Sequence, residues 1–492
     1  MPALRRFVVA ALLGAALAPA APVAAQIAPS EYAARRDSLA ARVGDGIVVA
    51  FGERTPVSDF GPFFQLPAFH YLTGYDYADA DLILVVRHGR GTGTLYVTRS
   101  TPRRALYYGE EPDSAAIAAA TGLPSVPVNG FAAAMDSLAA AGLPFYTLRD
   151  FEDEDFAAAD SLTRGAAFMQ AFASRHAGVE IKDAHPIVDR LRARKSPAEI
   201  ALLRDAAAVS ARGHVALMRN IAPGMHEYDL RAIAECVFGR GGADRVAYGS
   251  IVGAGPNGTI LHYMKDTREL KPGDLVVVDA AAQVKGYAAD ITRTLPVSGT
   301  FTPAQREIYQ LVRDAQAAAE RNSRAGMSMV AAQDSSLDVR ARGLARLGLV
   351  DSATATFDPP WPADCARNPR ACRQVQLWAI HGISHGLGLA VHDPVQGYYG
   401  DRTFQVGDAF TIEPGLYLSP KLLDILPDTP RNRAFIARVR PVLARYGEMG
   451  VRIEDDYVIT PQGTERISPA PREIAEVEAT IAKRPAPSCP AE

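Results

Sequence analysis

The chain has 492 residues, of which 48% are hydrophobic, and its 52 basic residues nearly balance 55 acidic ones. This length allows two or three domains, each with a core of its own. A formal net charge of −3 provides no basic field, which argues against a nucleic-acid-binding protein.

The first 25 residues contain the three parts of a secretory signal peptide. Arg5 and Arg6 precede an apolar run from Phe7 to about Ala21, and small residues lie at the −3 and −1 positions of a cut after Ala25. The run is short for a membrane span, which needs about 20 residues. We therefore expect an exported protein, periplasmic or secreted, that leaves the membrane after cleavage. A short membrane anchor is the alternative.

The next segments alternate between strand and helix patterns. Short apolar runs at Gly46–Phe51, Leu82–Val86 and Thr94–Thr98 are bounded by Gly, Arg or polar residues, which is typical of β-strands. An alanine-rich helical pattern covers Phe131–Ala141. Together these segments predict an α/β domain over residues 26–185.

A long helix is predicted after Ser196. A capping hydroxyl, Pro197 in the first turn and the acidic Glu199 near the positive helix end make a favourable helix start. The helical pattern continues to about Arg219, and a second helix is predicted over Glu227–Phe238.

Short strands and Gly-rich turns replace the helical patterns from Ala247 onward. We expect a second domain over residues 186–470. Residues 471–492 are predicted to be a flexible tail that begins with a helical stretch and becomes Pro-rich.

The four cysteines have different settings. Cys365 and Cys372 lie close together in a loop-like stretch, so an exported chain is predicted to join them in a disulfide, with two unpaired thiols as the alternative. Cys236 lies in an apolar helical pattern and is predicted to be a buried thiol. Cys489 lies in the Pro-rich tail and receives no role.

The segment Leu275–Leu295 predicts an antiparallel hairpin. Folding it about its midpoint places Asp279 opposite Asp290, so the two carboxylates share one face. Like charges there are destabilising unless a cation holds them or one carboxylate takes up a proton. The apolar run Val276–Val278 indicates burial, which favours a metal site over a solvent-facing acidic edge.

Three histidines, His381, His385 and His392, fall within one Gly-rich, apolar segment. A single histidine on an apolar face is usually a core residue, but three together indicate a site. Their positions alone do not select the metal ligand.

Two further segments carry carboxylates. Glu413 ends a predicted strand that Pro414-Gly415 stops, and Arg452 and Glu454 share one face of another predicted strand. Each is an ordinary polar strand face when taken alone. Four carboxylates with an imidazole form a hard ligand set that suits Mn²⁺, or Co²⁺, Zn²⁺ or Mg²⁺, and has enough charge for two ions about 3.5–4 Å apart.

The ordered strings DAAAQVKGYAADITRT, HGISHGLGLAVHD, TIEPGLY and RIEDD resemble the pita-bread metallopeptidases, and most of all their Xaa-Pro aminopeptidase (aminopeptidase P) and prolidase branch. The match covers about residues 186–468. More loosely, FFQLPAFHYLTGYDYADADLILV resembles the start domain of the same branch. The resemblance implies an α/β N-terminal creatinase-like domain plus an α+β pita-bread catalytic domain.

The resemblance also assigns metal ligands. Asp279 would chelate one ion, while Asp290 and Glu454 would bridge both. His385 and Glu413 would bind the other ion, and Glu413 would also pass a proton to the leaving nitrogen.

The resemblance assigns the remaining catalytic roles as well. His262 would support the mouth of the site, and His381 and His392 would contact substrate and stabilise the tetrahedral intermediate. Arg452 would lie beside the bridging glutamate and Tyr417 near the metal.

The function implied by this resemblance is that of an Xaa-Pro aminopeptidase. It would use two divalent ions, Mn²⁺ first with Co²⁺ or Zn²⁺ as alternatives, on peptides with proline at the second position, and would form a homo-oligomer. The alternatives are a prolidase limited to dipeptides, a metal-free creatinase-like hydrolase and a non-catalytic binding module.

Two features depart from the family pattern. Leu66-Pro67-Ala68 follow Gln65 where related chains often carry acidic residues, which puts a contact with the substrate amine in doubt. The Cys365–Cys372 segment and Leu422–Tyr446 resemble insertions near the site, where they can narrow its entrance.

Overall fold

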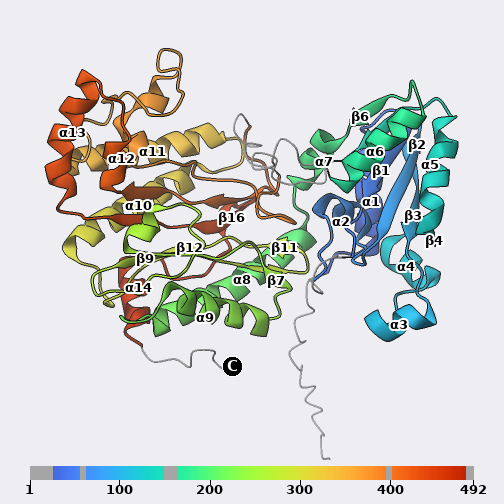
Figure 1. Cartoon of the computed structure of the whole chain (residues 1–492), viewed down its shortest axis with the longest axis horizontal. Coiled ribbons are helices and arrows are strands. Elements are labelled where there is room, and N and C mark those ends of the chain that lie inside the picture. The colour runs from blue at the N-terminus through green and yellow to red at the C-terminus, as the bar shows by residue number, and fades with distance from the viewer. Residues whose placement is uncertain (1–25, 56–61, 149–162, 395–401, 484–492) are drawn as a thin grey trace, which may run out of the picture.

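The computed structural model describes residues 26–55, 62–148, 163–394 and 402–483, which form two lobes (Figure 1). The predicted signal peptide, residues 1–25, and Cys489 lie outside the described residues. Among the helices that are described, none combines the length and apolar character that a membrane crossing requires.

The N-terminal lobe is built on one six-stranded mixed sheet. The strand order is β4-β3-β2-β1-β5-β6, with β1 antiparallel to β2 and parallel to β5. The strands are β1 Gly46–Phe51, β2 Ala80–Arg87, β3 Arg90–Val97, β4 Ser125–Pro127, β5 Phe145–Thr147 and β6 Ile181–Asp183. All three strands predicted for this lobe are therefore confirmed.

Helices cover both faces of this sheet, because β1 is apolar on both faces. Ile47 and Val49 pack in the core that contains Phe131 and Phe172, while Val48 packs in the opposite core. The helices are α1 Pro29–Ala40, α2 Pro67–Thr73, α3 Pro102–Tyr108, α4 Ser114–Thr121, α5 Phe131–Ala139 and α6 Arg164–Arg175.

Two helices lead from one lobe to the other. Helix α7, His185–Arg192, precedes α8, Pro197–Asn220, and α9 covers Glu227–Arg240. The start of α8 is confirmed as a capping box, in which Ser196 and Glu199 accept each other's backbone N–H.

The C-terminal lobe contains four small sheets with long helices outside them (Figure 1). The sheet orders are β11-β10-β7, β12-β9-β8, β13-β16-β17 and β14-β15. The strands are β7 Arg245–Val246, β8 Ile251–Ala254, β9 Leu275–Asp279, β10 Ala282–Val284, β11 Tyr287–Ala288, β12 Thr292–Pro296, β13 Ala409–Ile412, β14 Gly415–Leu418, β15 Met449–Arg452, β16 Asp455–Thr460 and β17 Gly463–Arg466. The helices are α10 Pro303–Asn322, α11 Met329–Leu347, α12 Pro420–Asp424, α13 Pro430–Leu443 and α14 Ile474–Ile481.

The predicted hairpin exists, but its register differs from the prediction. Asp279 pairs with Thr292 rather than with Asp290. The reason is the turn, which is centred on Lys285-Gly286, where both residues have positive φ. That turn lies one residue later than the centre of a hairpin that pairs Asp279 with Asp290, so the partner of Asp279 moves by two positions and Asp290 becomes its diagonal neighbour.

The predicted strand around Glu454 is interrupted. β15 ends at Arg452 and pairs with β14, while β16 begins at Asp455 and pairs with β13. Arg452 and Glu454 therefore do not share one strand face. Glu454 lies in the break where the chain passes from one sheet to the next.

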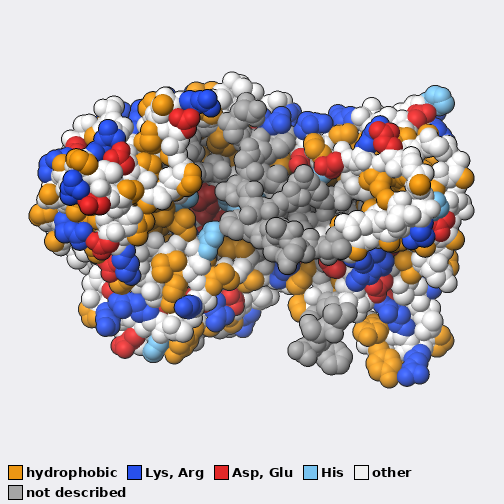
Figure 2. Space-filling model, turned by 45° about the horizontal axis from the view of Figure 1, so that its top comes forward, with side chains coloured by type: hydrophobic (Ala, Val, Ile, Leu, Met, Phe, Trp, Pro, Cys, Tyr) orange, Lys and Arg blue, Asp and Glu red, His pale blue; other side chains and the backbone are white. Residues whose placement is uncertain are grey.

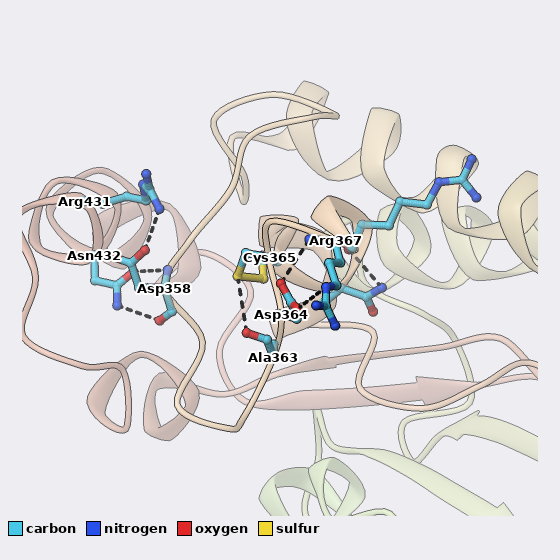
Figure 3. The surroundings of a disulfide bond; sticks show 10 residues. Asp358, Ala363, Asp364, Cys365, Arg367, Arg431 and Asn432 are labelled. Atoms are coloured by element: carbon cyan, nitrogen blue, oxygen red, sulfur yellow. Dashed lines mark hydrogen bonds and ion pairs between the residues drawn. A yellow bond between two sulfur atoms is a disulfide. The ribbon is translucent and has the colours of Figure 1, made fainter.

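The cysteines give one confirmation and one correction. Cys365 and Cys372 form a disulfide with a Cα–Cα distance of 5.6 Å, as predicted. Figure 3 shows this disulfide beside Asp358, which contacts Arg431 and Asn432 of the second insertion. The prediction of a buried thiol at Cys236 was wrong, because Cys236 is half-buried and disulfide-bonded.

The segment after residue 470 is ordered at its start. The predicted helical stretch is α14, whose Val477 and Ile481 are buried in the main core of the C-terminal lobe. This part of the expected tail therefore packs against the domain.

Candidate metal centre

The predicted ligands lie at strand ends and in short connections between strands of the C-terminal lobe, and all of them line one cavity of about 430 Å³. Asp279 ends β9, Asp290 lies between β11 and β12, Glu413 follows β13 and Glu454 separates β15 from β16. His385 comes from the loop before β13. Figure 2 shows acidic and histidine side chains at the hollow where the left-hand lobe faces the other lobe.

Three of the predicted ligands form the tightest group. Asp290, His385 and Glu454 each offer one ligand atom, and these atoms all lie within 4.8 Å of one another. From Nε2 of His385, the distances are 3.4 Å to Asp290 Oδ2, 3.5 Å to Glu413 Oε1 and 4.0 Å to Glu454 Oε1. Glu413 therefore borders the same space.

A hydrogen bond within its own loop sets the tautomer of His385. Its Nδ1 lies 2.9 Å from the carbonyl oxygen of Gly386, which can only accept, so Nδ1 carries the proton. In the neutral ring, Nε2 then directs a lone pair at Asp290, Glu413 and Glu454. This is the arrangement in which a neutral imidazole binds a metal.

Asp279 has a different environment from the other three carboxylates. Its Oδ2 accepts a hydrogen bond of 2.6 Å from Arg452 Nη2, and its Oδ1 accepts one from the Tyr248 hydroxyl. The same hydroxyl lies 2.5 Å from Oδ1 of Asp290. Tyr248 thus joins the two aspartates that the hairpin register leaves diagonal.

The pKa values of the carboxylates separate accordingly. Burial raises the pKa of Asp290, Glu413 and Glu454 well above the ordinary value, and neighbouring carboxylates raise each of them further. Burial also acts to raise the pKa of Asp279, but Arg452 and the hydrogen bond from Tyr248 hold it below the ordinary value.

A chain of hydrogen bonds runs behind the ligands. Arg452 Nη1 donates to the Tyr417 hydroxyl over 2.8 Å, and that hydroxyl donates to Nε2 of His381 over 2.8 Å. His381 Nδ1 lies 2.6 Å from the carbonyl of Gly382, so it carries the ring proton. Burial, with Arg452 and Arg340, lowers the pKa of His381 to about 3, so the ring is neutral.

The other predicted histidines also line the cavity. His262 is exposed on its wall, as expected for a residue at the mouth. The ring of His392 lies 4.2 Å from that of His385, between their centroids. All the residues predicted for the site therefore meet in one place.

Three contributors were missed by the sequence analysis. Tyr248 joins the two aspartates, Thr292 donates to Glu454 Oε2 over 2.6 Å, and Asp456 accepts the backbone N–H of Asp290. Thr292 was detectable, because it lies two residues after Asp290 on the same strand face. The sequence carries no signal for Tyr248, which precedes the strand β8.

The donor set fits divalent cations. Among the described residues that line the cavity, four are carboxylates, whereas Arg452 is the one Lys or Arg. Burial and the neighbouring carboxylates raise the pKa of three of the four, which favours their protonated form, and Nε2 of His385 faces them. Replacing those protons with a cation would relieve the repulsion, since hard oxygen ligands with one imidazole suit Mn²⁺, Co²⁺ or Zn²⁺.

The two insertions do not border this cavity. Its described lining residues include none from the Cys365–Cys372 segment or from Leu422–Tyr446. Leu422–Tyr446 contacts Asp358, which precedes the disulfide segment, through Thr429 and Asn432 at the start of α13. The structure gives no support for a narrowed entrance.

Comparison with known proteins is consistent across sequence and structure. Residues 201–461 match the model of metallopeptidase family M24, and residues 32–142 match that of the aminopeptidase P N-terminal domain. The chain is 32% identical over 460 residues to an Xaa-Pro aminopeptidase of Escherichia coli strain K12, covering 90% of this chain and 95% of that protein.

Solved structures give the same result. An aminopeptidase from Pseudomonas aeruginosa superposes with a TM-score of 0.74 at 29% identity, covering 93% of this chain and 99% of that one. Zinc-substituted E. coli aminopeptidase P in complex with product gives 0.74 at 30% identity, covering 94% and 100%.

Proposed function

Because this chain belongs to metallopeptidase family M24, we propose that it is an exported Xaa-Pro aminopeptidase that releases the N-terminal residue before proline. It is a metal-dependent peptidase, and its predicted fold class, a creatinase-like α/β domain plus a pita-bread catalytic domain, is confirmed. Two divalent ions, Mn²⁺ first with Co²⁺ or Zn²⁺ as alternatives, belong to the proposal, as does a homo-oligomeric state.

One observation carries the proposal. Asp290, Glu413 and Glu454 converge on the lone pair of His385 in a buried cavity, where only cations or protons can offset their repulsion. Asp279 adjoins them through Tyr248. The number of carboxylates supports two ions rather than one, and Asp290 and Glu454 would be the two residues that hold both.

When bound, the cations supply Lewis-acid polarisation of the scissile carbonyl and acidify an attacking water. Glu413 is the residue to which the proposal assigns the proton transfer, because it borders the ligand group with one carboxylate oxygen 3.5 Å from Nε2 of His385. The nitrogen of an X-Pro bond carries no hydrogen, so it must receive one to leave. Glu413 takes a proton from water and delivers it to that nitrogen.

The histidines orient the substrate. His381 is neutral and is held by Tyr417 and Gly382, which gives it one fixed orientation on the cavity wall. Arg452 holds Tyr417 and Asp279 at the same time, so it couples the substrate-facing wall to the ligands. His262 and His392 complete the wall that a peptide would contact.

The cysteines support the proposal of export. Cys365 and Cys372 are disulfide-bonded, Cys236 is also disulfide-bonded, and no described cysteine is free. Disulfides persist mainly in oxidising compartments such as the periplasm or the extracellular space. Sequencing the N-terminus of the protein isolated from its own cell envelope tests this, and a mature chain that still begins at Met1 would contradict it.

The decisive experiment is a cleavage profile with Mn²⁺ added. An X-Pro-Y-Z peptide should lose its first residue, while a matched X-Ala-Y-Z peptide should be cut far more slowly. Cleavage of X-Pro dipeptides alone would make the protein a prolidase, and full activity in excess chelator would favour a creatinase-like hydrolase. No cleavage of any peptide would favour a binding module.

Metal analysis of the purified chain tests the dinuclear centre. The expected result is two ions per chain, with loss of turnover on dialysis against chelator and recovery with Mn²⁺. One ion per chain at full activity would reject the bridging roles of Asp290 and Glu454.

A further inference from the structure

One residue, Asp393, closes the loop that connects two of the site histidines, His385 and His392. The loop begins at Gly386, directly after His385, and ends at Asp393, directly after His392. The backbone N–H of Asp393 donates to the carbonyl of Gly386 over 3.0 Å, which joins the two ends. Its carboxylate Oδ2 accepts the backbone N–H of Leu389 over 2.7 Å, which ties down the middle.

The carbonyl of Gly386 has two donors. One is the Asp393 N–H, and the other is Nδ1 of His385 at 2.9 Å. The bond that closes the loop therefore fixes the same oxygen that sets the tautomer of the proposed metal ligand. Any movement of Asp393 would change the direction of the His385 lone pair and the place of the adjacent His392.

Two basic residues from the junction between the lobes hold Asp393. Arg192, at the end of α7, donates from Nε to Asp393 Oδ1 over 3.0 Å, and Lys195 donates from Nζ to the Asp393 carbonyl over 2.9 Å. All three residues are buried, with exposed fractions of 1% for Arg192, 5% for Lys195 and 1% for Asp393. Burying three charged side chains together costs free energy unless each one is paired and hydrogen-bonded in good geometry.

The glycines of the loop show how close this packing is. A Cβ on Gly386 would clash with the Asp393 carbonyl oxygen. On Gly388, a Cβ would approach the Asp393 carboxylate even more closely. The loop can wrap around the carboxylate only because these positions have no side chains.

We propose that Asp393 is a positioning residue for the metal centre, held by Arg192 and Lys195, which sets the tautomer and direction of His385 and the place of His392. The part of this proposal that concerns His392 rests on the proposed function. The effect of Asp393 on metal affinity can be measured without a substrate. The junction between the two lobes thus contributes to the site without touching it.

The test is Asp393→Asn in the full-length protein. An amide cannot accept at both of its ends, so its NH₂ would face either Arg192 Nε or the Leu389 N–H, and one bond is lost. Mn²⁺ affinity, measured by titrating the metal-free protein, should fall by about 10- to 100-fold, as for other groups that support ligands. In the Mn²⁺-saturated enzyme, kcat should fall by roughly 10- to 100-fold, with a smaller change in KM.

The matched control is Asp81→Asn in the N-terminal lobe. Asp81 is also fully buried and also paired with two basic residues, Arg54 and Arg164. It should lose stability while keeping Mn²⁺ affinity and kcat. Equal losses of Mn²⁺ affinity and kcat in Asp81→Asn and Asp393→Asn would show that reduced stability alone causes them, and would overturn the proposal.

Two further variants complete the test. In a His392→Ala background, Asp393→Asn should lower kcat much less than in the wild type, since the two act on one unit; a full additional loss would contradict positioning of His392. If Asp393→Asn does not fold, Lys195→Met decides, because it keeps the carboxylate and removes one bond. Unchanged Mn²⁺ affinity and kcat in that variant would overturn the proposal, whereas a wild type that cannot cut X-Pro peptides would reject the proposed function alone.

Discussion

Glu454 and Asp455 are adjacent in the chain but belong to opposite electrostatic regions. Glu454 faces the acidic cluster with Asp290 and Asp279, and burial together with these carboxylates raises its pKa well above the ordinary value. Asp455 points the other way and accepts hydrogen bonds from Arg293, Arg466 and Arg472. Burial acts to raise its pKa as well, but the three guanidinium groups hold it far below the ordinary value.

The difference between the two clusters is whether the protein itself balances the buried carboxylates. In the arginine cluster, the protein itself provides the opposite charge, so the buried carboxylate stabilises a single fold. In the acidic cluster, Arg452 is balanced by Asp279, and the remaining carboxylates depend on protons or cations. Buried charge that the chain leaves uncompensated therefore marks the functional site, while equally buried charge beside it does not.

Removing Glu454, the member of the pair that lies in the acidic cluster, should have the largest effect on activity. We expect Glu454→Ala to lose metal at both positions and to lower kcat/KM by well over the roughly 100-fold seen for groups that only support ligands. Metal analysis and steady-state kinetics on the purified variant measure both. Two retained ions with an unchanged rate would contradict the bridging role.

Changing Asp455, the member in the arginine cluster, should lower the stability of the fold instead. Asp455→Asn leaves buried arginines with an incomplete partner and should lower the free energy of unfolding by about 3–5 kcal/mol. Because the pKa of Asp455 is lowered in the folded state, its contribution is present above the ordinary value of 3.8 and is lost as the pH falls below it. Urea unfolding at several pH values should show a flatter acid limb in the variant, and parallel curves would argue against this assignment.

His381→Ala tests the wall of the cavity rather than the ligands. The variant should keep its metal and lower kcat by about 100- to 1000-fold, the loss typical of one group that stabilises developing charge. Metal content and kcat must be measured on the same preparation. A metal-free variant would show that His381 acts on the ligands instead.

The smallest effect concerns pH. The raised pKa values of Asp290, Glu413 and Glu454 mean that the metal-free fold gains stability from bound protons, and this gain is lost as the pH rises through those values. Metal takes the place of the protons, so the loaded fold is spared. The difference in the free energy of unfolding between loaded and metal-free protein should widen with rising pH, by about 1.4 kcal/mol per pH unit for each proton displaced, and the difference in Tm should widen with it. A narrowing difference would reverse the sign of the argument.

Local elements were predictable because their signals are local. The strand Gly46–Phe51 and the capping box of Ser196 depend on residues within a few positions of one another, and both are present as predicted. The disulfide between Cys365 and Cys372 belongs to the same class, because it closes a short loop.

The errors occurred where a small local choice has distant consequences. A turn centred one residue later gives Asp279 the partner Thr292, and a break after Arg452 sends Glu454 between two sheets. Cys236 was assigned from an apolar helix pattern, which contains no information about whether the thiol forms a disulfide.

By itself, the sequence determined which residues could bind metal, because carboxylates and imidazole in a recognisable order carry that chemistry wherever they lie. Only the tertiary structure decided how they differ. It paired Asp279 with Arg452 and Tyr248, and it closed the histidine loop with Asp393. Among the described residues that line the cavity, it gave Asp290, Glu413 and Glu454 no Lys or Arg side chain of their own. The physical reason is that pKa, tautomer and ligand direction depend on neighbours a few ångströms away, and those neighbours come from segments far apart in the chain.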